Sequence, residues 1–492
     1  MQTGKRVGSN FAWRFAERVG AQGVNLVVEL VLARKLDTEH YGLIALVTVF
    51  ISILSIFISS GMGTALIQKK DSDALDFSTV FWFNVVMSFV LYGLLFLGAP
   101  LVADFYRMPE ITDVLRVLGL QLIVSGVKNT QLAYVSRHMI FRRFFFATLG
   151  GTIGAAIIGI WMAMNGYGVW ALVAQHLFNT LIDTIILWFT VKWRPKFQFS
   201  FARLKRLFSF GWKMLLSSLI DKIYNEIRQL LIGKIYTPSD LAFYNRGRQF
   251  PHLFVTNVNS SIDSVLLPTM SREQERSARV KAMTRRAIKT STYVMAPIMM
   301  GLAFTAEPFV RLVLTDKWLP CVPYLRIFCI AFMFQPIHTA NLNAIKAMGR
   351  SDLFLILEII KKVIGITVLV ITVNISVMAL AYSMLFTNVT SQIINSWPNR
   401  KLLGYSYLNQ MRDILPAILL AVFMGGCVYL VGYIDLESWQ TLLIQVPLGA
   451  AIYVGGSKLL KLDSFDYLLK LIREALHHRR STGKKTNKET LK

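Results

Sequence analysis

Apolar residues run through this chain in long blocks that are separated by short polar loops. Residues 42–67, 80–103 and 354–373 each form such a block, and about 20 apolar residues are needed for a helix to cross the hydrocarbon core of a bilayer. The pattern therefore predicts a polytopic helical membrane protein. The predicted spans, about fourteen in number, are residues 11–34, 42–67, 80–103, 112–135, 146–164, 168–190, 207–235, 241–268, 288–314, 322–345, 354–373, 376–396, 413–433 and 439–460.

The composition favours the same class, because 54% of the 492 residues are hydrophobic and only 16% are charged. The longest polar stretches are residues 191–206, residues 269–286 and the tail from residue 464, and each is far shorter than an independent domain. No soluble catalytic domain is expected. Charged residues interrupt the first apolar segment, so we interpret it as a spanning helix rather than as a cleavable signal peptide.

The basic residues indicate the orientation of the chain in the membrane. The net charge is +25, and lysine and arginine gather in every second loop, as in residues 137–143, 192–206 and 272–289. Positively charged loops stay on the cytoplasmic side, so we predict a multi-pass membrane protein with both termini in the cytoplasm. Residues 464–492 are predicted to be an amphipathic, basic tail on anionic membrane lipids. Nucleic acid is not an expected partner, because the charge is spread over loops.

The sequence carries no motif that indicates an enzyme. Cys321, Cys329 and Cys427 form no CxxC pair, so neither a metal site nor a disulfide framework is predicted. Asp71-Ser72-Asp73 lies in a short loop, where a solvated turn is favoured over a nucleotide-sugar site, and no Walker A sequence occurs. We predict no enzyme activity, no catalytic residue and no cofactor.

An internal repeat with an offset of about 200 residues defines the expected domains. Residues 36–42 parallel residues 236–242, and Trp13-Arg14 parallels Trp212-Lys213. Two six-helix lobes in the same orientation, related by pseudo-two-fold symmetry, are expected, with two extra C-terminal helices. The predicted domains are residues 1–206 and 207–400 for the lobes, 401–463 for the extra helices and 464–492 for the tail.

Three predicted helices place charged and polar residues along one side at helical spacing. Arg246 lies on a different side of its helix, and Lys222 and Glu226 form an i, i+4 pair at the edge of a stripe. The stripes are Asn10, Arg14, Glu17, Arg18, Asn25 and Glu29 in the first helix, Lys213, Ser217, Asp221, Tyr224, Asn225 and Arg228 in residues 207–235, and Arg248, His252, Asn259 and Asp263 in residues 241–268.

These stripes predict a water-filled cavity, because a charged side chain at the bilayer centre costs on the order of 3 kcal/mol. Ion pairs that fix helix packing, and side chains near helix ends that reach the membrane surface, are the alternative interpretation. Cations outnumber acids, and guanidinium groups suit phosphate, so the substrate is expected to be anionic. The candidate substrate-binding residues are Arg14, Arg18, Lys213, Arg228, Arg246 and Arg248, and the candidate coupling or ion-pair residues are Glu17, Glu29, Asp221 and Glu226.

Several local motifs resemble the multidrug/oligosaccharidyl-lipid/polysaccharide exporter superfamily, and within it the polysaccharide transporter branch that includes O-antigen and colanic acid flippases. They are the Trp13-Arg14 opening, Tyr41-Gly42-Leu43-Ile44-Ala45-Leu46, Gly166-Tyr167-Gly168-Val169-Trp170-Ala171-Leu172 and Gly349-Arg350-Ser351-Asp352. The resemblance covers essentially residues 5–460.

The resemblance implies a protein of the bacterial inner membrane with two lobes that open alternately to either side. It further implies that the lobes move an undecaprenyl-pyrophosphate-linked oligosaccharide across that membrane for surface or exopolysaccharide synthesis. Membrane lipids and other polysaccharide-assembly proteins are the further partners it suggests, and protons, sodium or the membrane potential are the candidate energy sources. A cation-coupled exporter of drugs or small amphiphiles is the alternative, although a basic cavity suits an anion better. A membrane-embedded glycan-assembly enzyme is the remote alternative.

Overall fold

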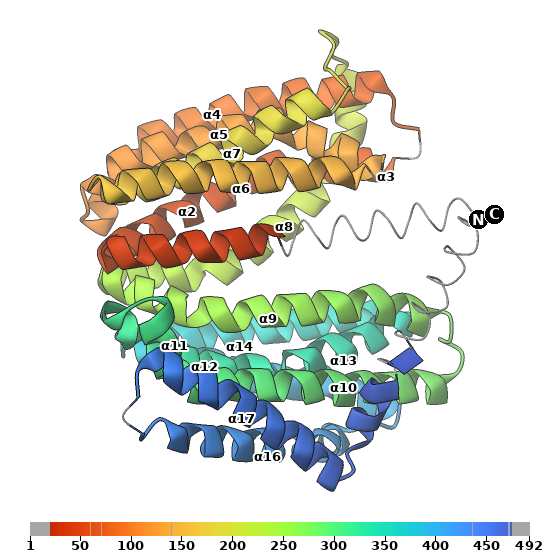
Figure 1. Cartoon of the computed structure of the whole chain (residues 1–492). Coiled ribbons are helices and arrows are strands. Elements are labelled where there is room, and N and C mark those ends of the chain that lie inside the picture. Colours follow the sequence, from red (N-terminus) through yellow and green to blue (C-terminus); the bar gives the residue numbers. More distant parts are fainter. Residues whose placement is uncertain are drawn as a thin grey trace, which may run out of the picture. The chain divides into compact units, whose positions relative to one another are not determined.

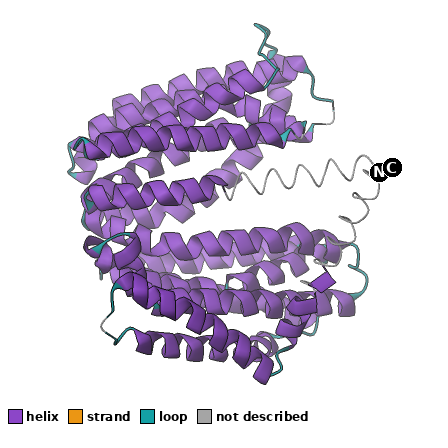
Figure 2. Cartoon of the chain, viewed as in Figure 1, coloured by secondary structure: helices purple, strands orange, loops and turns teal. Residues whose placement is uncertain are grey.

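The structure is a computed structural model, and it describes residues 20–59, 61–69, 71–138, 140–434, 436–470 and 473–474. The regular structure of this described part consists of helices alone (Figures 1 and 2). The chain divides into two compact units, Met1–Ala242 and Phe243–Lys492.

The first unit is built around tightly paired helices. Pairs α4 and α5, and α6 and α7, pack along their lengths, and α5 also contacts α2 and α7. At Gly126 of α5 an added β-carbon would lie 2.5 Å from the Ser88 hydroxyl oxygen of α4, so only glycine allows this approach. The unit contains a helical segment at residues 20–35, α2 (Thr38–Ser59), α3 (Met62–Gln68), α4 (Ala74–Tyr106), α5 (Glu110–Arg137), α6 (Phe141–Met164), α7 (Val169–Thr190), α8 (Phe201–Ile235) and the start of α9 (Pro238–Ser271).

The second unit is centred on α10, which contacts α12, α13 and α16. Buried aliphatic side chains such as Val280, Ile288 and Ile337 form its core. Its elements are the rest of α9, α10 (Ser277–Phe304), α11 (Ala306–Val313), the 3-10 helix η1 (Asp316–Cys321), α12 (Val322–Met333), α13 (Gln335–Ala347), α14 (Ser351–Thr372), α15 (Val377–Leu402), α16 (Tyr407–Val431) and α17 (Ser438–Leu459).

Two of the predicted spans are broken in the second unit. Helices α10 and α11 meet at Thr305 with a bend of 72°. Helices α12 and α13 meet at Phe334, and Pro336 occupies the first turn of α13, where a missing backbone N–H leaves no hydrogen bond unmade. Backbone groups freed at such breaks must be satisfied inside the protein, because lipid cannot bond them.

Polar side chains join three helices inside the second unit. The Asn399 amide of α15 donates to Asn341 Oδ1 of α13 at 2.7 Å, and Asn341 donates to Gln410 Oε1 of α16 at 2.8 Å. All three side chains are fully buried. Interhelical hydrogen bonds of this kind supply specific packing where lipid gives helices no hydrophobic reason to associate.

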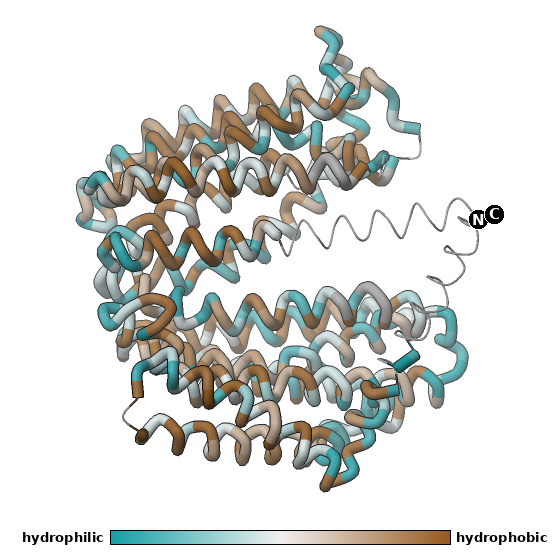
Figure 3. Tube along the Cα trace, viewed as in Figure 1, coloured by the Kyte–Doolittle hydropathy of each residue, from teal (hydrophilic) through white to brown (hydrophobic). Residues whose placement is uncertain are grey.

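Large apolar side chains cover much of the helix surface, as expected for a bilayer environment. Leu97 and Leu101 of α4 and Phe189 of α7 are each more than 70% exposed, and hydrophobic positions run along the helices while polar ones concentrate at many of their ends (Figure 3). Within the described residues, eight helices are long and apolar enough to cross a membrane, or nine if the bent pair α10 and α11 counts as one span.

The prediction of an all-α membrane protein is confirmed, and each predicted span from residue 42 onward coincides with one helix or one pair of consecutive helices. The count of fourteen crossings stays a prediction, as does the division at residues 206, 400 and 463. In the structure α8 packs against α2, α3 and α4 of the first unit. The tail beyond residue 474 lies outside the described residues.

Candidate functional site

Helix α8 of the first unit has one packed side and one charged, exposed side. Its packed side reaches α3 through Gly211, where an added β-carbon would lie 2.9 Å from the Gly61 carbonyl oxygen. On the exposed side lie Lys213, Asp221 and Asn225, and the Asn225 amide donates to the Asp221 carbonyl at 2.8 Å. Lys213 forms no ion pair or hydrogen bond with any described residue. This side of α8 therefore offers solvated charge within a bundle of spanning helices.

Two further cations of α8 have different surroundings. Lys222 Nζ lies 2.7 Å from Glu226 Oε1, and Gln229 also donates to the Glu226 carboxylate, so this charge is neutralised locally. Arg228 is only 9% exposed, and its Nε has no hydrogen-bond partner in the described part of the chain. A buried guanidinium donor without an acceptor is costly, and an anionic ligand would relieve that cost.

The first predicted helix is described only from Gly20 onward. Arg14, Glu17 and Arg18 therefore lie outside the described residues. Glu29 is half-buried, and its carboxylate lies near the half-buried His176 of α7. Glu29 is thus held within the first unit, as an ion-pair or coupling residue would be.

The cations of α9 separate into a packed one and an accessible one. Arg246 is 6% exposed, donates to Gln249 Oε1 at 2.7 Å, and places its guanidinium 5.2 Å from the centre of a Trp318 ring. Arg248 is half-buried and forms no ion pair with a described residue. Arg246 has the contacts of a packing residue, whereas Arg248 has a free charge to offer.

The acidic and aromatic neighbours on α9 are held by other helices of the second unit. The Asn343 amide of α13 donates to Asp263 Oδ1 at 2.7 Å, and the His252 ring packs edge-on to Phe332 of α12, with 5.9 Å between ring centroids. These two members of the predicted stripe therefore have protein partners already.

A charge pair inside the first unit was not predicted from the sequence. Lys128 of α5 bonds the carboxylate of Asp183 on α7, and the two side chains are only 18% and 12% exposed. Asp183 Oδ1 accepts no hydrogen bond, and neither amide atom of the fully buried Gln131, one turn along α5, has a partner in the described residues. The sequence signals were Lys128 within residues 112–135 and Asp183 within residues 168–190, and neither identifies the other as its partner.

No group of three or more histidine, cysteine, aspartate or glutamate side chains in the described residues is arranged to hold a metal ion. Cys321 and Cys329 are buried, and Cys427 is partly buried. The capping aspartate of the Asp71-Ser72-Asp73 segment is engaged structurally, because Asp73 accepts the backbone N–H of Asp76 at the start of α4 and pairs with Arg203.

Comparison with protein families gives a match over most of the chain. A family model described as "Polysaccharide biosynthesis protein" matches residues 31–323. The teichuronic acid biosynthesis protein TuaB of Bacillus subtilis is 23% identical, with 83% of this chain and 85% of that protein covered. The lipopolysaccharide biosynthesis protein WzxC of Escherichia coli is 22% identical, with 74% of each covered. The succinoglycan biosynthesis transport protein ExoT of Rhizobium meliloti is 25% identical, with 66% of each covered.

Solved structures share the fold. The structure titled "Lipid II flippase MurJ, inward closed conformation" has a TM-score of 0.76 at 15% identity and covers 92% of this chain and 98% of its own. An inward-facing multidrug resistance MATE family transporter of the MOP superfamily has a TM-score of 0.62 at 14% identity, with 77% and 94% covered. At these identities the likeness shows the fold alone.

Proposed function

Because the chain belongs to the polysaccharide biosynthesis protein family, we propose that it moves an anionic, lipid-linked oligosaccharide across the bacterial inner membrane by alternating access. The resemblance to the polysaccharide transporter branch is confirmed by this membership and by the relatives. The chain is a multi-pass membrane transporter and not an enzyme. A cytoplasmic position of both termini rests on the distribution of basic loops.

The observation that carries the proposal is the unpaired positive charge on α8, which packs against the helices α2, α3 and α4 of a membrane protein. Lys213 is exposed and has no partner among the described residues, and Arg228 is buried with no described acceptor for its Nε. Such charges are rare in spanning helices and mark substrate pathways. A pyrophosphate group would supply acceptors to both ammonium and guanidinium donors, so we assign these two residues to the phosphate end of the substrate.

The remaining predicted cations have different expected roles under this proposal. Arg248 offers an unpaired charge and is retained as a substrate contact, together with Arg14 and Arg18 of the first helix. Arg246 already stacks on Trp318 and bonds Gln249, so its expected contribution is to packing. Among the acids, Glu226 neutralises Lys222, while Glu17, Glu29 and Asp221 stay candidates for proton or sodium coupling.

Proteoliposome flipping tests the proposal directly. The full-length protein is reconstituted with an undecaprenyl-pyrophosphate disaccharide that carries a fluorescent label on the sugar, and an impermeant quencher reports which leaflet holds it. We expect Lys213→Ala to lower the initial flipping rate at least tenfold. Lys205→Ala is the matched control, because Lys205 is exposed on the same helix nearer its start. Equal rates for wild type and Lys213→Ala would overturn the assignment of Lys213.

The same vesicles distinguish the lipid-linked oligosaccharide from the alternative cargo, an organic cation. Protein-dependent efflux of a cationic dye driven by a proton or sodium gradient, with no movement of the labelled lipid, would favour the drug-exporter function. Movement of the lipid that stops when its pyrophosphate is replaced by a neutral linkage supports the anionic substrate. Imposing each gradient in turn identifies the energy source.

A further inference from the structure

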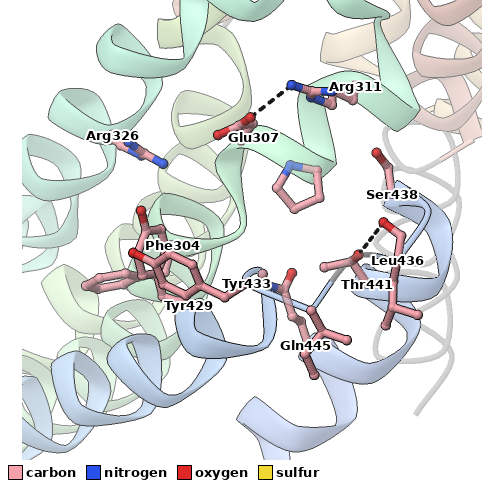
Figure 4. A pocket seen from close by; sticks show the side chains of 13 residues that line it. Phe304, Glu307, Arg311, Arg326, Tyr429, Tyr433, Leu436, Ser438, Thr441 and Gln445 are labelled. Atoms are coloured by element: carbon pink, nitrogen blue, oxygen red, sulfur yellow. Dashed lines mark hydrogen bonds and ion pairs between the residues drawn. The ribbon is translucent and has the colours of Figure 1, made fainter.

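A polar cavity lies inside the second unit, at the end of α10 where the chain bends into α11. It has a volume of about 480 Å³, within the range of small-molecule sites. Figure 4 shows side chains from the α10–α11 bend, from α12 and from the segment joining α16 to α17 around one opening. None of the residues predicted from the sequence as substrate contacts lines it.

One cation of this cavity is neutralised and the other is not. Arg311 Nη2 lies 3.1 Å from Glu307 Oε1, and its Nη1 lies 3.7 Å from Asp316 Oδ1. Arg326 is half-buried on α12, and its Nε donates to the Ala303 carbonyl at 3.3 Å. Arg326 forms no ion pair with any described residue. The free charge of the cavity therefore belongs to Arg326.

Three aromatic rings form one wall of the cavity. The rings of Phe304 and Tyr429 lie 6.1 Å apart at 65°, and those of Tyr429 and Tyr433 lie 5.6 Å apart at 86°. Edge-to-face is one of the arrangements that aromatic pairs prefer. The rings combine an apolar surface with the two tyrosine hydroxyl groups.

A buried amide in the same lining lacks a partner. Gln445 of α17 is 2% exposed, and its Nε2 donates to the Val428 carbonyl at 3.0 Å, but its Oε1 accepts no hydrogen bond from a described residue. An unsatisfied buried acceptor is costly unless a ligand or water donates to it. Thr441, one turn before Gln445 on α17, and Ser438, at the start of that helix, add hydroxyl groups to the lining (Figure 4).

We propose that this cavity binds an acidic sugar residue, with Arg326 bonding its carboxylate, the aromatic wall covering its apolar face and Gln445 Oε1 accepting from a hydroxyl. A sugar presents carboxylate, C–H and hydroxyl groups together, which matches this lining. A phospholipid phosphate diester matches it less well, because the diester itself brings no hydroxyl donor to Gln445 Oε1 and no C–H face to the aromatic wall.

The position of the cavity suggests a role after translocation, and this inference rests on the proposed function. Helix α10 begins in the basic residues 272–289, which are predicted to be cytoplasmic, and the cavity is at its other end. A site there would hold the glycan of a substrate that has already crossed, and it restricts the cargo to glycans that contain a uronic acid or a similar acidic sugar.

Binding of free sugars tests the site without requiring transport. The purified full-length protein is titrated with a labelled glucuronate-containing tetrasaccharide, with a neutral glucose tetrasaccharide of the same length and with glycerophosphate. We expect at least tenfold tighter binding of the acidic sugar than of the neutral one, and at least a tenfold loss in Arg326→Gln. Arg311→Gln is the matched control and should change affinity less than threefold, because Arg311 is already paired with carboxylates.

Several results would overturn the inference. They are equal affinity for acidic and neutral sugars, unchanged binding in Arg326→Gln, or glycerophosphate competing for the site, which would indicate a lipid headgroup instead. The melting temperature of each variant shows whether it is folded. Gln445→Leu is a second test of the site, because a folded Gln445→Leu protein should also bind the acidic sugar more weakly. If the protein flips the labelled lipid but does not bind the acidic sugar, only the inferred sugar site is refuted. If it binds the sugar but does not flip the lipid, only the proposed function is refuted.

Discussion

The charge pair between Lys128 and Asp183 gives a prediction that separates packing from transport. Replacing Lys128 by methionine leaves the Asp183 carboxylate buried without its only described cation, and replacing Asp183 by leucine strands the ammonium group. The double variant Lys128→Met/Asp183→Leu removes both charges and fills a similar volume with apolar atoms. The three variants and the wild type form a double-mutant cycle.

The expected magnitudes follow from the burial of the pair. Removing one partner of a buried ion pair costs about 3–5 kcal/mol, whereas replacing both by apolar residues is neutral or stabilises by about 1–4 kcal/mol. Because the two side chains keep 18% and 12% exposure, we take the lower end, about 3 kcal/mol for each single variant. For a unit of the size of Met1–Ala242, this corresponds to a fall in melting temperature of roughly 6–12 °C.

Melting temperature in detergent and flipping rate in proteoliposomes are measured for all four proteins. If the pair serves packing alone, both single variants melt lower and flip more slowly, and the double variant regains both properties. Single variants that melt within 1 °C or so of the wild type would refute the reasoning, since they would show that the pair is solvated. A double variant with restored stability but no flipping would instead show that Asp183 has a part in transport, as a proton or cation carrier.

Two further predictions concern local structure in the first unit. Asp73→Ala removes the side-chain cap of α4 and should lower the free energy of unfolding by about 0.5–2 kcal/mol. The backbone N–H of Asp76 holds the pKa of Asp73 below its ordinary 3.8. The difference in stability between the variant and the wild type should therefore persist at neutral pH and vanish as the pH falls through that lowered pKa. Gly42→Val should cost about 1–3 kcal/mol or more, because a β-carbon there would lie 1.8 Å from the Pro238 carbonyl oxygen, whereas Gly98→Ala, with open space around it, is the control. Melting temperatures check both, and an unaffected Gly42→Val protein contradicts the close contact.

The helices were predictable from sequence because a bilayer demands long apolar segments, and this demand acts on each segment separately. The breaks within the predicted spans were harder to predict from the sequence. Pro336 gave a local signal for the break before α13, and Pro308, three residues after Thr305, gave one for a break between α10 and α11. Neither proline fixes the size of the 72° bend. Such a bend depends on what α10 and α11 pack against, which periodicity does not contain.

The rotation of a helix in its bundle limited the site prediction in the same way. A helical wheel places Lys213 and Arg228 within one broad side of α8, yet the structure exposes the first and buries the second. The lining of the cavity beside Arg326 could not be predicted from the sequence either. Arg326 and Gln445 are separated by more than a hundred residues, and only folding brings them to one opening.

The structure changes how charge in a membrane protein is used as evidence of a substrate. A count of cations overstates the evidence for an anionic substrate, because Lys222 and Lys128 are each neutralised by a carboxylate within their own unit. What indicates a ligand is the charge left over after such pairs are removed. Among the predicted substrate-binding residues that the structure describes, Lys213, Arg228 and Arg248 are left over. Their excess requires an anion or water beside them, because the alternative is an uncompensated charge in a medium that cannot solvate it. The preference for an anionic cargo therefore survives the loss of the paired lysines.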